Sequence, residues 1–161
     1  MWRQHLAMRL FESEIRRSRS HMKVTASAGS TATCPCGGTS SSTLPLSACC
    51  GRYHVGPELL RAPNAEALMR SRYSAYVLGL TDYLLATWHP STRPASMEAN
   101  PPGLTWLGLQ VRSHEVQDAT HATVDFVARS KQGGRAQRMH EKSRFIFEGG
   151  FWFYVDGDVQ A

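Results

Sequence analysis

The sequence lacks any apolar run of about 20 residues, the length that a helix needs to cross a bilayer. Its longest apolar stretches, such as residues 73–80, are short and interrupted. It also lacks an apolar segment of 7–15 residues followed by a small-residue cleavage site, so we expect no secretory signal. These absences predict a cytoplasmic protein that does not enter membranes. Thiols in that compartment stay reduced, which disfavours disulfides.

Most of the chain also lacks an excess of charge of one sign. The net charge of the whole chain is +5, but residues 1–23 hold six basic and two acidic side chains and account for +4. Residues 24–161 hold twelve basic and eleven acidic side chains, a net charge of +1. This distribution makes a nucleic-acid-binding face on the folded part an unfavoured interpretation. We interpret residues 1–33 as a basic leader and linker that is either disordered or mis-called at its start, with Met22 as the true start and residues 1–21 outside the protein.

Cysteine is scarce and confined to one segment. All four cysteines lie between residues 34 and 50, in the pattern C-x-C followed by C-C. A redox C-x-x-C pair is absent, and a bridge between adjacent Cys49 and Cys50 would be strained. Structural zinc takes four soft ligands in a tetrahedron, which four thiolates satisfy. We therefore interpret Cys34, Cys36, Cys49 and Cys50 as ligands of Zn²⁺, with His54 as a reserve ligand.

Helical periodicity dominates residues 65–80. The apolar residues fall at offsets that form one face of a helix: Ala65, Leu68, Met69, Tyr73, Tyr76, Val77 and Leu80. Asn64 suits the N-cap and Gly79 the C-terminal end. A second helix is predicted over residues 82–89, capped by Thr81 and stopped by Pro90.

The remainder has the alternating pattern of strands. Four strands are predicted at residues 104–116, 120–131, 136–148 and 151–156, with Gly-Gly turns at 133–134 and 149–150. The alternation places Leu107, Leu109 and Val111 on one side of the first strand and His114 on the other. Helices followed by an antiparallel meander define an α+β fold.

The segments that follow the cysteines carry a resemblance to a known family. The C-P-C-G…C-C segment is similar to a SEC-C metal-binding motif, and MRSRYSAY, TWHPSTRP and FWFYVDG recur in the order found in the YchJ family of bacterial proteins. The resemblance covers residues 34 to about 157. It implies a small zinc-binding knob at residues 34–56 and a nuclear-transport-factor-2-like (NTF2-like) domain at residues 57–161. That domain is expected to be a cone in which a curved antiparallel sheet wraps helices. The spacer between the cysteine pairs has twelve residues, against about eight in the family.

Several polar residues lie where the fold predicts burial. Arg72 occupies the apolar stripe of the first helix, where a charge needs a partner or a cavity. We expect it to form an ion pair with Glu141 or Asp125, or else to bind an anion in the cone. His89 is expected to cap the second helix at its C-terminus, with a general base as the alternative. The pocket predicted inside the cone is lined by Arg72, Tyr73, Trp88, His89 and Glu141.

Two functions from different classes remain open at this point, beside a third and less favoured one, nucleic-acid binding by the basic leader, which would not apply if Met22 is the start. The first is a zinc-stabilised binding or adaptor module, since SEC-C motifs, by the resemblance, act as small interaction modules. Its partner would be a protein or a small ligand in the cone, and a homodimer through the sheet is a further expectation. The second is an isomerase, dehydratase or hydrolase with a pocket acid and base. Its candidate catalytic residues are His89, Asp125, Glu141 and Tyr73, but fold alone does not establish a reaction.

Overall fold

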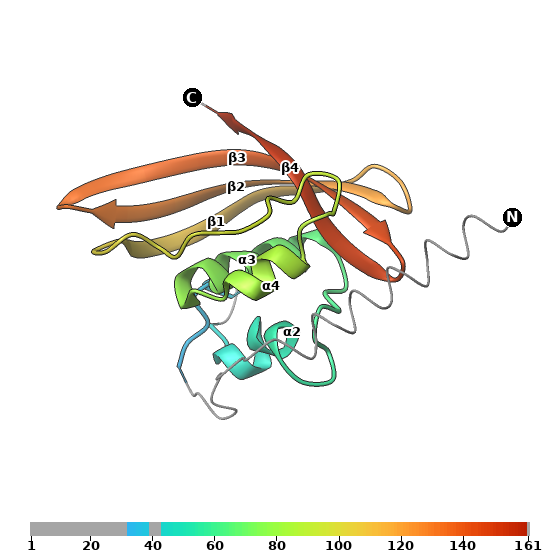
Figure 1. Cartoon of the computed structure of the whole chain (residues 1–161), viewed down its shortest axis with the longest axis horizontal. Coiled ribbons are helices and arrows are strands. Elements are labelled where there is room, and N and C mark those ends of the chain that lie inside the picture. The colour runs from blue at the N-terminus through green and yellow to red at the C-terminus, as the bar shows by residue number, and fades with distance from the viewer. Residues whose placement is uncertain (1–31, 39–42, 161) are drawn as a thin grey trace, which may run out of the picture.

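The computed structural model describes residues 32–38 and 43–160. The predictions for residues 1–31, including the leader and Met22, lie outside the described residues. A short 3₁₀ helix η1 (Leu46–Ala48) and helix α2 (Gly51–His54) follow the first cysteine pair. Helices α3 (Ala65–Leu78) and α4 (Thr81–Ala86) come next, followed by four strands. Figure 1 shows the sheet over one side of α3 and α4, with α2 on the opposite side of these helices.

Helix α3 begins and ends at the residues predicted from its caps. The Asn64 side chain accepts a hydrogen bond from the backbone N–H of Ala67 at 2.8 Å, which satisfies one of the free donors of the first turn. Gly79 ends the helix in the left-handed conformation. Such an N-cap contributes about 1 kcal/mol to stability. The predicted helix is therefore confirmed, two residues shorter at its C-terminal end.

Helix α4 is shorter than the sequence pattern predicted. It ends at Ala86, and Leu80 rather than Thr81 is its N-cap. The Oγ1 of Thr87 donates to the carbonyl oxygen of Tyr83 and so closes the last turn. His89 therefore lies outside the helix, and its predicted role as a C-terminal cap is wrong.

The four strands form an antiparallel meander in the order β1-β2-β3-β4. The edge strands are β1 (Thr105–Val116) and β4 (Phe151–Gln160). The central strands are β2 (His121–Gln132) and β3 (Arg135–Glu148). Gly133 and Gly134 form the turn between β2 and β3 with φ angles of 57° and 80°. Two successive positive φ angles suit glycine and match the twist of the flanking strands.

Two bulges in β1 change which side chains face the helices. Register shifts fall between Trp106 and Gly108 and between Val111 and Ser113. Each bulge adds a residue to one strand and resets its alternation. Leu107 is consequently 53% exposed, while His114 lies opposite the buried Val124 on the helix-facing side. The prediction that Leu107 shares a side with Leu109 and Val111, with His114 on the other side, is wrong for this reason.

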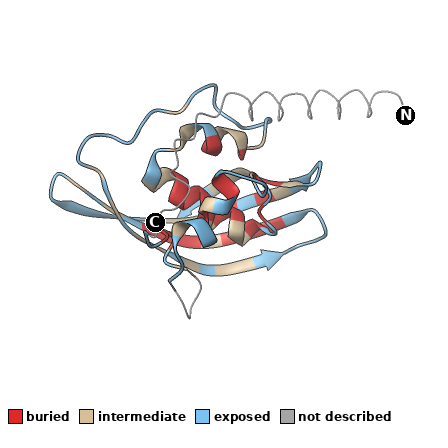
Figure 2. Cartoon of the chain, turned by 90° about the horizontal axis from the view of Figure 1, so that it is seen from below, coloured by how far each residue is buried: buried red, intermediate tan, exposed pale blue. Residues whose placement is uncertain are grey.

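The core lies between α3 and the helix-facing side of the sheet, which we call the inner face. Burial is concentrated there and in the adjoining turns (Figure 2). Leu68 and Met69 of α3 pack with inner-face side chains of the sheet, namely Ala122, Val124, Phe126, Ala128 and Phe145. A second cluster around Tyr83 and Leu84 joins α4 to α3. The α+β class is thus confirmed. No described helix has the length and apolarity that spanning a bilayer requires.

Candidate metal centre

The four cysteine sulfurs form one compact cluster. Their Sγ atoms all lie within 4.8 Å of one another. The Sγ–Sγ separations are 3.5 Å for Cys34–Cys36, 3.6 Å for Cys36–Cys49 and 4.0 Å for Cys49–Cys50. A tetrahedral ion with metal–sulfur bonds of about 2.3 Å needs sulfurs about 3.8 Å apart. All four thiols are free, so the cluster fits a metal ion and is not a pair of disulfides.

A short two-stranded pairing brings the two cysteine pairs together. The backbone N–H of Cys34 donates to the carbonyl oxygen of Leu44 at 2.9 Å, and that of Leu46 donates to Ala32 at 2.8 Å. These bonds flank the bridge between Thr33 and Pro45. Cys49 and Cys50 lie between η1 and α2, and their sulfurs meet those of the first pair. Backbone hydrogen bonds therefore hold residues 44–46, inside the spacer, against the chain around Cys34.

The surroundings of the cluster favour thiolates at some sulfurs and thiols at others. Hydrogen bonds from Cys36 and Cys50 lower the pKa of the Cys34 thiol far below its usual range. Burial, reinforced by the negative charges of Cys36 and Cys34, raises the pKa of Cys49 to about 12. The backbone N–H of Gly38 also donates to the sulfur of Cys36 at 3.4 Å. A divalent cation would take the place of the protons that these thiols share.

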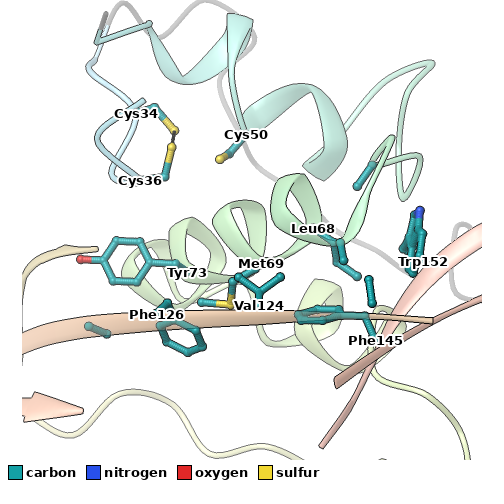
Figure 3. Close-up of a cluster of buried hydrophobic side chains, with 14 residues drawn as sticks. Cys34, Cys36, Cys50, Leu68, Met69, Tyr73, Val124, Phe126, Phe145 and Trp152 are labelled. Carbon is teal, nitrogen blue, oxygen red and sulfur yellow. Dashed lines mark hydrogen bonds between the residues drawn. The ribbon is translucent and has the colours of Figure 1, made fainter. Parts of the chain in front are cut away.

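The cluster is attached to helix α3 by side chains from that helix. Arg70 donates from Nη1 to the carbonyl oxygen of Gly38 at 2.9 Å, and its Nε pairs with Glu66 at 2.8 Å. The Ser74 hydroxyl lies 3.5 Å from the sulfur of Cys34. Cys34, Cys36 and Cys50 are buried against α3, as Figure 3 shows. Arg70 was not among the predicted site residues, because its role depends on contacts with carbonyl oxygens 32 and 34 positions away in the chain.

His54 does not belong to the sulfur cluster. It is almost fully buried, and its Nε2 donates to the carbonyl oxygen of Ser71 at 2.8 Å. Its ring packs edge-on against Tyr83, with centroids 4.6 Å apart. Burial lowers the pKa of the imidazole. His54 therefore anchors α2 to α3, and its assignment as a reserve metal ligand is wrong.

Arg72 is buried without the predicted ion pair. Its Nη1 donates to the carbonyl oxygen of Leu84 and to Oγ1 of Thr87, each at 2.7 Å. Its guanidinium carbon lies 4.7 Å from the ring centre of Tyr154 and 5.3 Å from that of Trp88. No carboxylate lies within 4.0 Å of it in the part of the chain that the structure describes. Hydrogen bonds to α4 and two aromatic faces hold this cation instead.

Glu141 belongs to the same region, on the inner face of β3. Its Oε1 accepts hydrogen bonds from Ser143 at 2.6 Å and from the Tyr154 hydroxyl at 3.2 Å. Burial and the Glu141 charge raise the pKa of Tyr154 above its usual value. Gly157 on β4 leaves room for this carboxylate, since a Cβ at that position would collide with it. Tyr154, which the sequence analysis missed, therefore links Glu141 to Arg72.

The other candidate residues have separate partners. His89 lies beyond α4, where its Nε2 contacts Glu148 at 3.0 Å. Asp125 points to the face of the sheet opposite the inner face and accepts from His140 at 2.8 Å. The Tyr73 ring packs edge-on against Trp106. The four residues expected to act in catalysis thus lie in different surroundings.

The TWHPSTRP motif lies against the free edge of β4. The backbone N–H of His89 donates to Tyr154, and the N–H of Tyr154 donates to Thr87. Trp88 packs edge-on against Tyr154 with centroids 5.0 Å apart, and its Nε1 donates to the carbonyl oxygen of Val155. Two motifs distant in the sequence therefore meet, and they cover an edge that would otherwise be open.

These features define a class of protein: an NTF2-like domain with a four-cysteine metal-type knob packed on its first long helix. The family model for the YchJ middle NTF2-like domain matches residues 64–157, more than half of the chain. The protein belongs to the YchJ family.

The relatives and solved structures agree with this assignment. The chain is 56% identical over 131 residues to a UPF0225 protein of Bordetella parapertussis, covering 81% of this chain and 96% of that protein. It is 58% identical to a UPF0225 protein of Polaromonas naphthalenivorans, covering 80% and 98%. A crystal structure of a SEC-C motif containing protein from Psychrobacter arcticus matches with a TM-score of 0.66 and 30% identity, covering 82% and 85%. The solution structure of a SEC-C motif containing protein from Rhodopseudomonas palustris matches with a TM-score of 0.65 and 29% identity, covering 81% and 100%.

Proposed function

We propose that this protein is a binding module, an adaptor for a protein partner, whose N-terminal knob is completed by a structural zinc ion. The observation that carries the proposal is the cluster of four Sγ atoms within 4.8 Å of one another. Three of the four cysteines are buried, and none forms a disulfide. Bringing four thiols together in the interior is unfavourable unless a cation binds them.

The choice of a structural role rests on the number of donors. Catalytic zinc sites keep one coordination position open for water or substrate, whereas four protein ligands fill a tetrahedron. Cys34, Cys36, Cys49 and Cys50 supply all four. The hydrogen bonds of Arg70 to the loop after Cys36 further fix this arrangement on α3.

The choice of zinc rests on ligand chemistry. Thiolates select soft and borderline metals, and a tetrahedral four-sulfur site accepts zinc or iron. Zinc has no redox chemistry and suits a site with a purely structural role. Iron is the competing occupant, and elemental analysis separates the two.

The choice of binding over catalysis rests on the dispersal of the polar residues. A general acid and a general base must reach the same substrate within hydrogen-bonding distance. His89 pairs with Glu148, Asp125 with His140, and Glu141 with Ser143 and Tyr154. Arg72, the strongest candidate for binding an anion, already donates hydrogen bonds to Leu84 and Thr87. This arrangement favours a scaffold over an acid–base pocket.

Elemental analysis of untagged protein tests the metal. We expect about one zinc per chain, and its loss when Cys34 and Cys36 are both replaced by serine. A zinc content below about half an equivalent in the wild type, or an unchanged content in the double variant, would refute the structural zinc. Iron in place of zinc would refute the choice of metal alone.

Affinity capture from native lysate tests the adaptor role. Wild-type protein and the C34S/C36S variant serve as baits, each with and without chelator. We expect a stoichiometric protein that the wild type retains and that chelator releases. Recovery of the same proteins on both baits, with and without chelator, would mean that the knob takes no part in binding. Turnover of a small molecule by the purified protein would point to the enzyme instead.

A further inference from the structure

The turn end of the β2–β3 hairpin carries a group of basic side chains that have no acidic partner. The hairpin projects past α3 and α4 at the left of Figure 1. Its exposed cations are Arg129 and Lys131 on β2 and Arg135 and Arg138 on β3. Among the described residues, none of these four forms an ion pair within 4.0 Å. We call this group the hairpin patch.

The rest of the same sheet face balances its charges. Lys142 pairs with Glu115 at 3.2 Å, and Arg144 pairs with Asp156 and Asp158. These residues, like Arg129, Lys131 and Arg138, lie on the outer face, the side of the sheet opposite the inner face. The outer face therefore has an unpaired basic end and a middle that contains carboxylates.

One contact in the hairpin patch opposes the stability of the fold. Arg129 lies directly opposite Arg138 in the register of β2 and β3. Directly opposed side chains are only about 5 Å apart at Cβ, and like charges in that position are destabilising. A carboxylate from outside the chain would remove this repulsion. The local structure therefore has a cost that a bound acidic group offsets.

We propose that the hairpin patch is the docking surface for a short acidic segment of a partner protein. The proposal rests on the adaptor role proposed above and names the chemistry of the partner. Arg129 and Lys131 are two residues apart on one strand, so their side chains emerge from the same face about 7 Å apart. Alternate side chains of an extended acidic peptide have the same spacing. A peptide with glutamates at alternate positions thus matches this row of cations, with Arg138 beside it.

The surroundings favour a peptide over a nucleic acid. Single-stranded nucleic acids bind by stacking bases on aromatic side chains beside a basic groove. Residues 127–140 include no aromatic side chain other than the imidazole of His140, which is occupied by Asp125. A longer polyanion laid along the outer face would also approach the carboxylates of Asp125 and Asp158. A local acidic cluster avoids both difficulties, and the exposed bulge residue Leu107, next to Gly108, the register partner of Arg129, offers an apolar contact.

The variant Arg138→Glu separates binding from folding. It places a carboxylate opposite Arg129, so the repulsive pair becomes an attractive one and the hairpin should be at least as stable as in the wild type. The control variant R61E/R93E lowers the net charge by four, twice the change made by R138E, at exposed arginines outside the patch.

The probe is a synthetic peptide with four glutamates at alternate positions, compared with its glutamine counterpart and with single-stranded DNA of about 12 nucleotides. Titrations use the full chain loaded with metal at about 50 mM salt, where surface charges are weakly screened. We expect the acidic peptide to bind the wild type, R138E to weaken binding about tenfold and R61E/R93E to leave it within about twofold. Thermal melting should show R138E as stable as the wild type or more so.

Three titration results would overturn the proposal. The first is that the acidic peptide does not bind, and the second is that R138E and R61E/R93E weaken peptide binding equally. The third is that the DNA binds the wild type more tightly than the peptide does and no longer binds R138E. Self-association of the wild type that R138E abolishes would instead assign the patch to a second copy of the chain, and would also overturn it. Because the titrations need no lysate, they can fail while the zinc and the captured partner are confirmed, and the reverse also holds.

Discussion

Arg70 of helix α3 donates from Nη1 to the carbonyl oxygen of Gly38, 2.9 Å away, across 32 positions of the chain. The same nitrogen lies 3.5 Å from the carbonyl oxygen of Cys36. One cationic side chain thus holds the loop that carries two of the four sulfurs, and it brings positive charge toward a cluster that becomes negative when its thiols ionise. The knob and the NTF2-like domain are linked by this contact as well as by burial of the cysteines.

The first prediction concerns Arg70. Arg70→Ala should weaken zinc binding by about 10- to 100-fold, because outer-shell partners of metal ligands typically contribute that much to affinity. Competition with a chromophoric chelator measures the change. Arg70→Lys keeps the charge but lacks the geometry for two carbonyl oxygens, so we expect an intermediate loss.

Arg93→Ala is the matched control for Arg70, since this exposed arginine forms no ion pair in the described part of the chain. Its zinc affinity should equal that of the wild type. An R70A protein with wild-type affinity would show that burial alone positions the sulfurs.

The second prediction concerns metal removal. Chelation should lower the free energy of unfolding by about 4 kcal/mol relative to protein held at a free metal concentration of about 1,000 times Kd. For a chain of this size that corresponds to a fall in melting temperature of about 10 °C. Calorimetry with and without chelator measures it. The C34S/C36S variant is the internal control, because chelator should change its melting temperature very little.

The third prediction concerns the space beside Gly157. Gly157→Ala should destabilise the fold by about 1–3 kcal/mol, because the added methyl group displaces the Glu141 carboxylate from Ser143 and Tyr154. Urea denaturation measures the loss. In the double variant G157A/E141A the methyl group no longer meets a carboxylate. The loss of stability should then differ by more than about 0.5 kcal/mol from the sum of the losses in the two single variants. Simple additivity would mean that the carboxylate moves aside without cost.

The fourth prediction concerns pH. Burial lowers the pKa of His54 below its ordinary value of 6.5, so the unfolded chain binds a proton that the folded chain does not. Stability attributable to His54 is therefore full above pH 6.5 and is lost as the pH falls below it, by up to about 1.4 kcal/mol per pH unit. We expect the free energy of unfolding of metal-loaded His54→Gln to fall less steeply than that of the wild type as the pH is lowered from 7. The comparison ends at the pH at which the metal dissociates. Parallel profiles would refute a role for His54.

The limits of helix α3 could be predicted from sequence because they depend on neighbouring residues. The Asn64 cap and the glycine at position 79 act locally, and the structure has both. The two bulges of β1 could not be predicted, since neither Leu107 nor Arg112 interrupts the alternation of residue types. Each bulge arises from pairing with β2, so the inward position of His114 depends on a strand that follows it in the sequence.

In the candidate site, too, the features that depend on nearby residues could be predicted and those that depend on distant residues could not. The four sulfurs were predictable because a cluster of cysteines in a short segment has few uses in a reducing compartment. The surroundings of Arg72 were not, because Tyr154 and the shortened end of α4 provide its contacts. A buried arginine was expected to need a carboxylate, and the aromatic faces that replace one come from segments 16 and 82 residues away.

The backbone pairing between Thr33 and Pro45 has a practical consequence for engineering. It joins the chain around Cys34 to residues 44–46, which lie within the twelve-residue spacer, so the number of residues between positions 38 and 44 does not set the distance between the two cysteine pairs. Loop closure costs only about 0.6 kcal/mol for each doubling of length. The spacer is therefore a suitable insertion site. A peptide tag or a fluorophore-labelling sequence placed between positions 40 and 41 should leave both the sulfur cluster and the sheet intact.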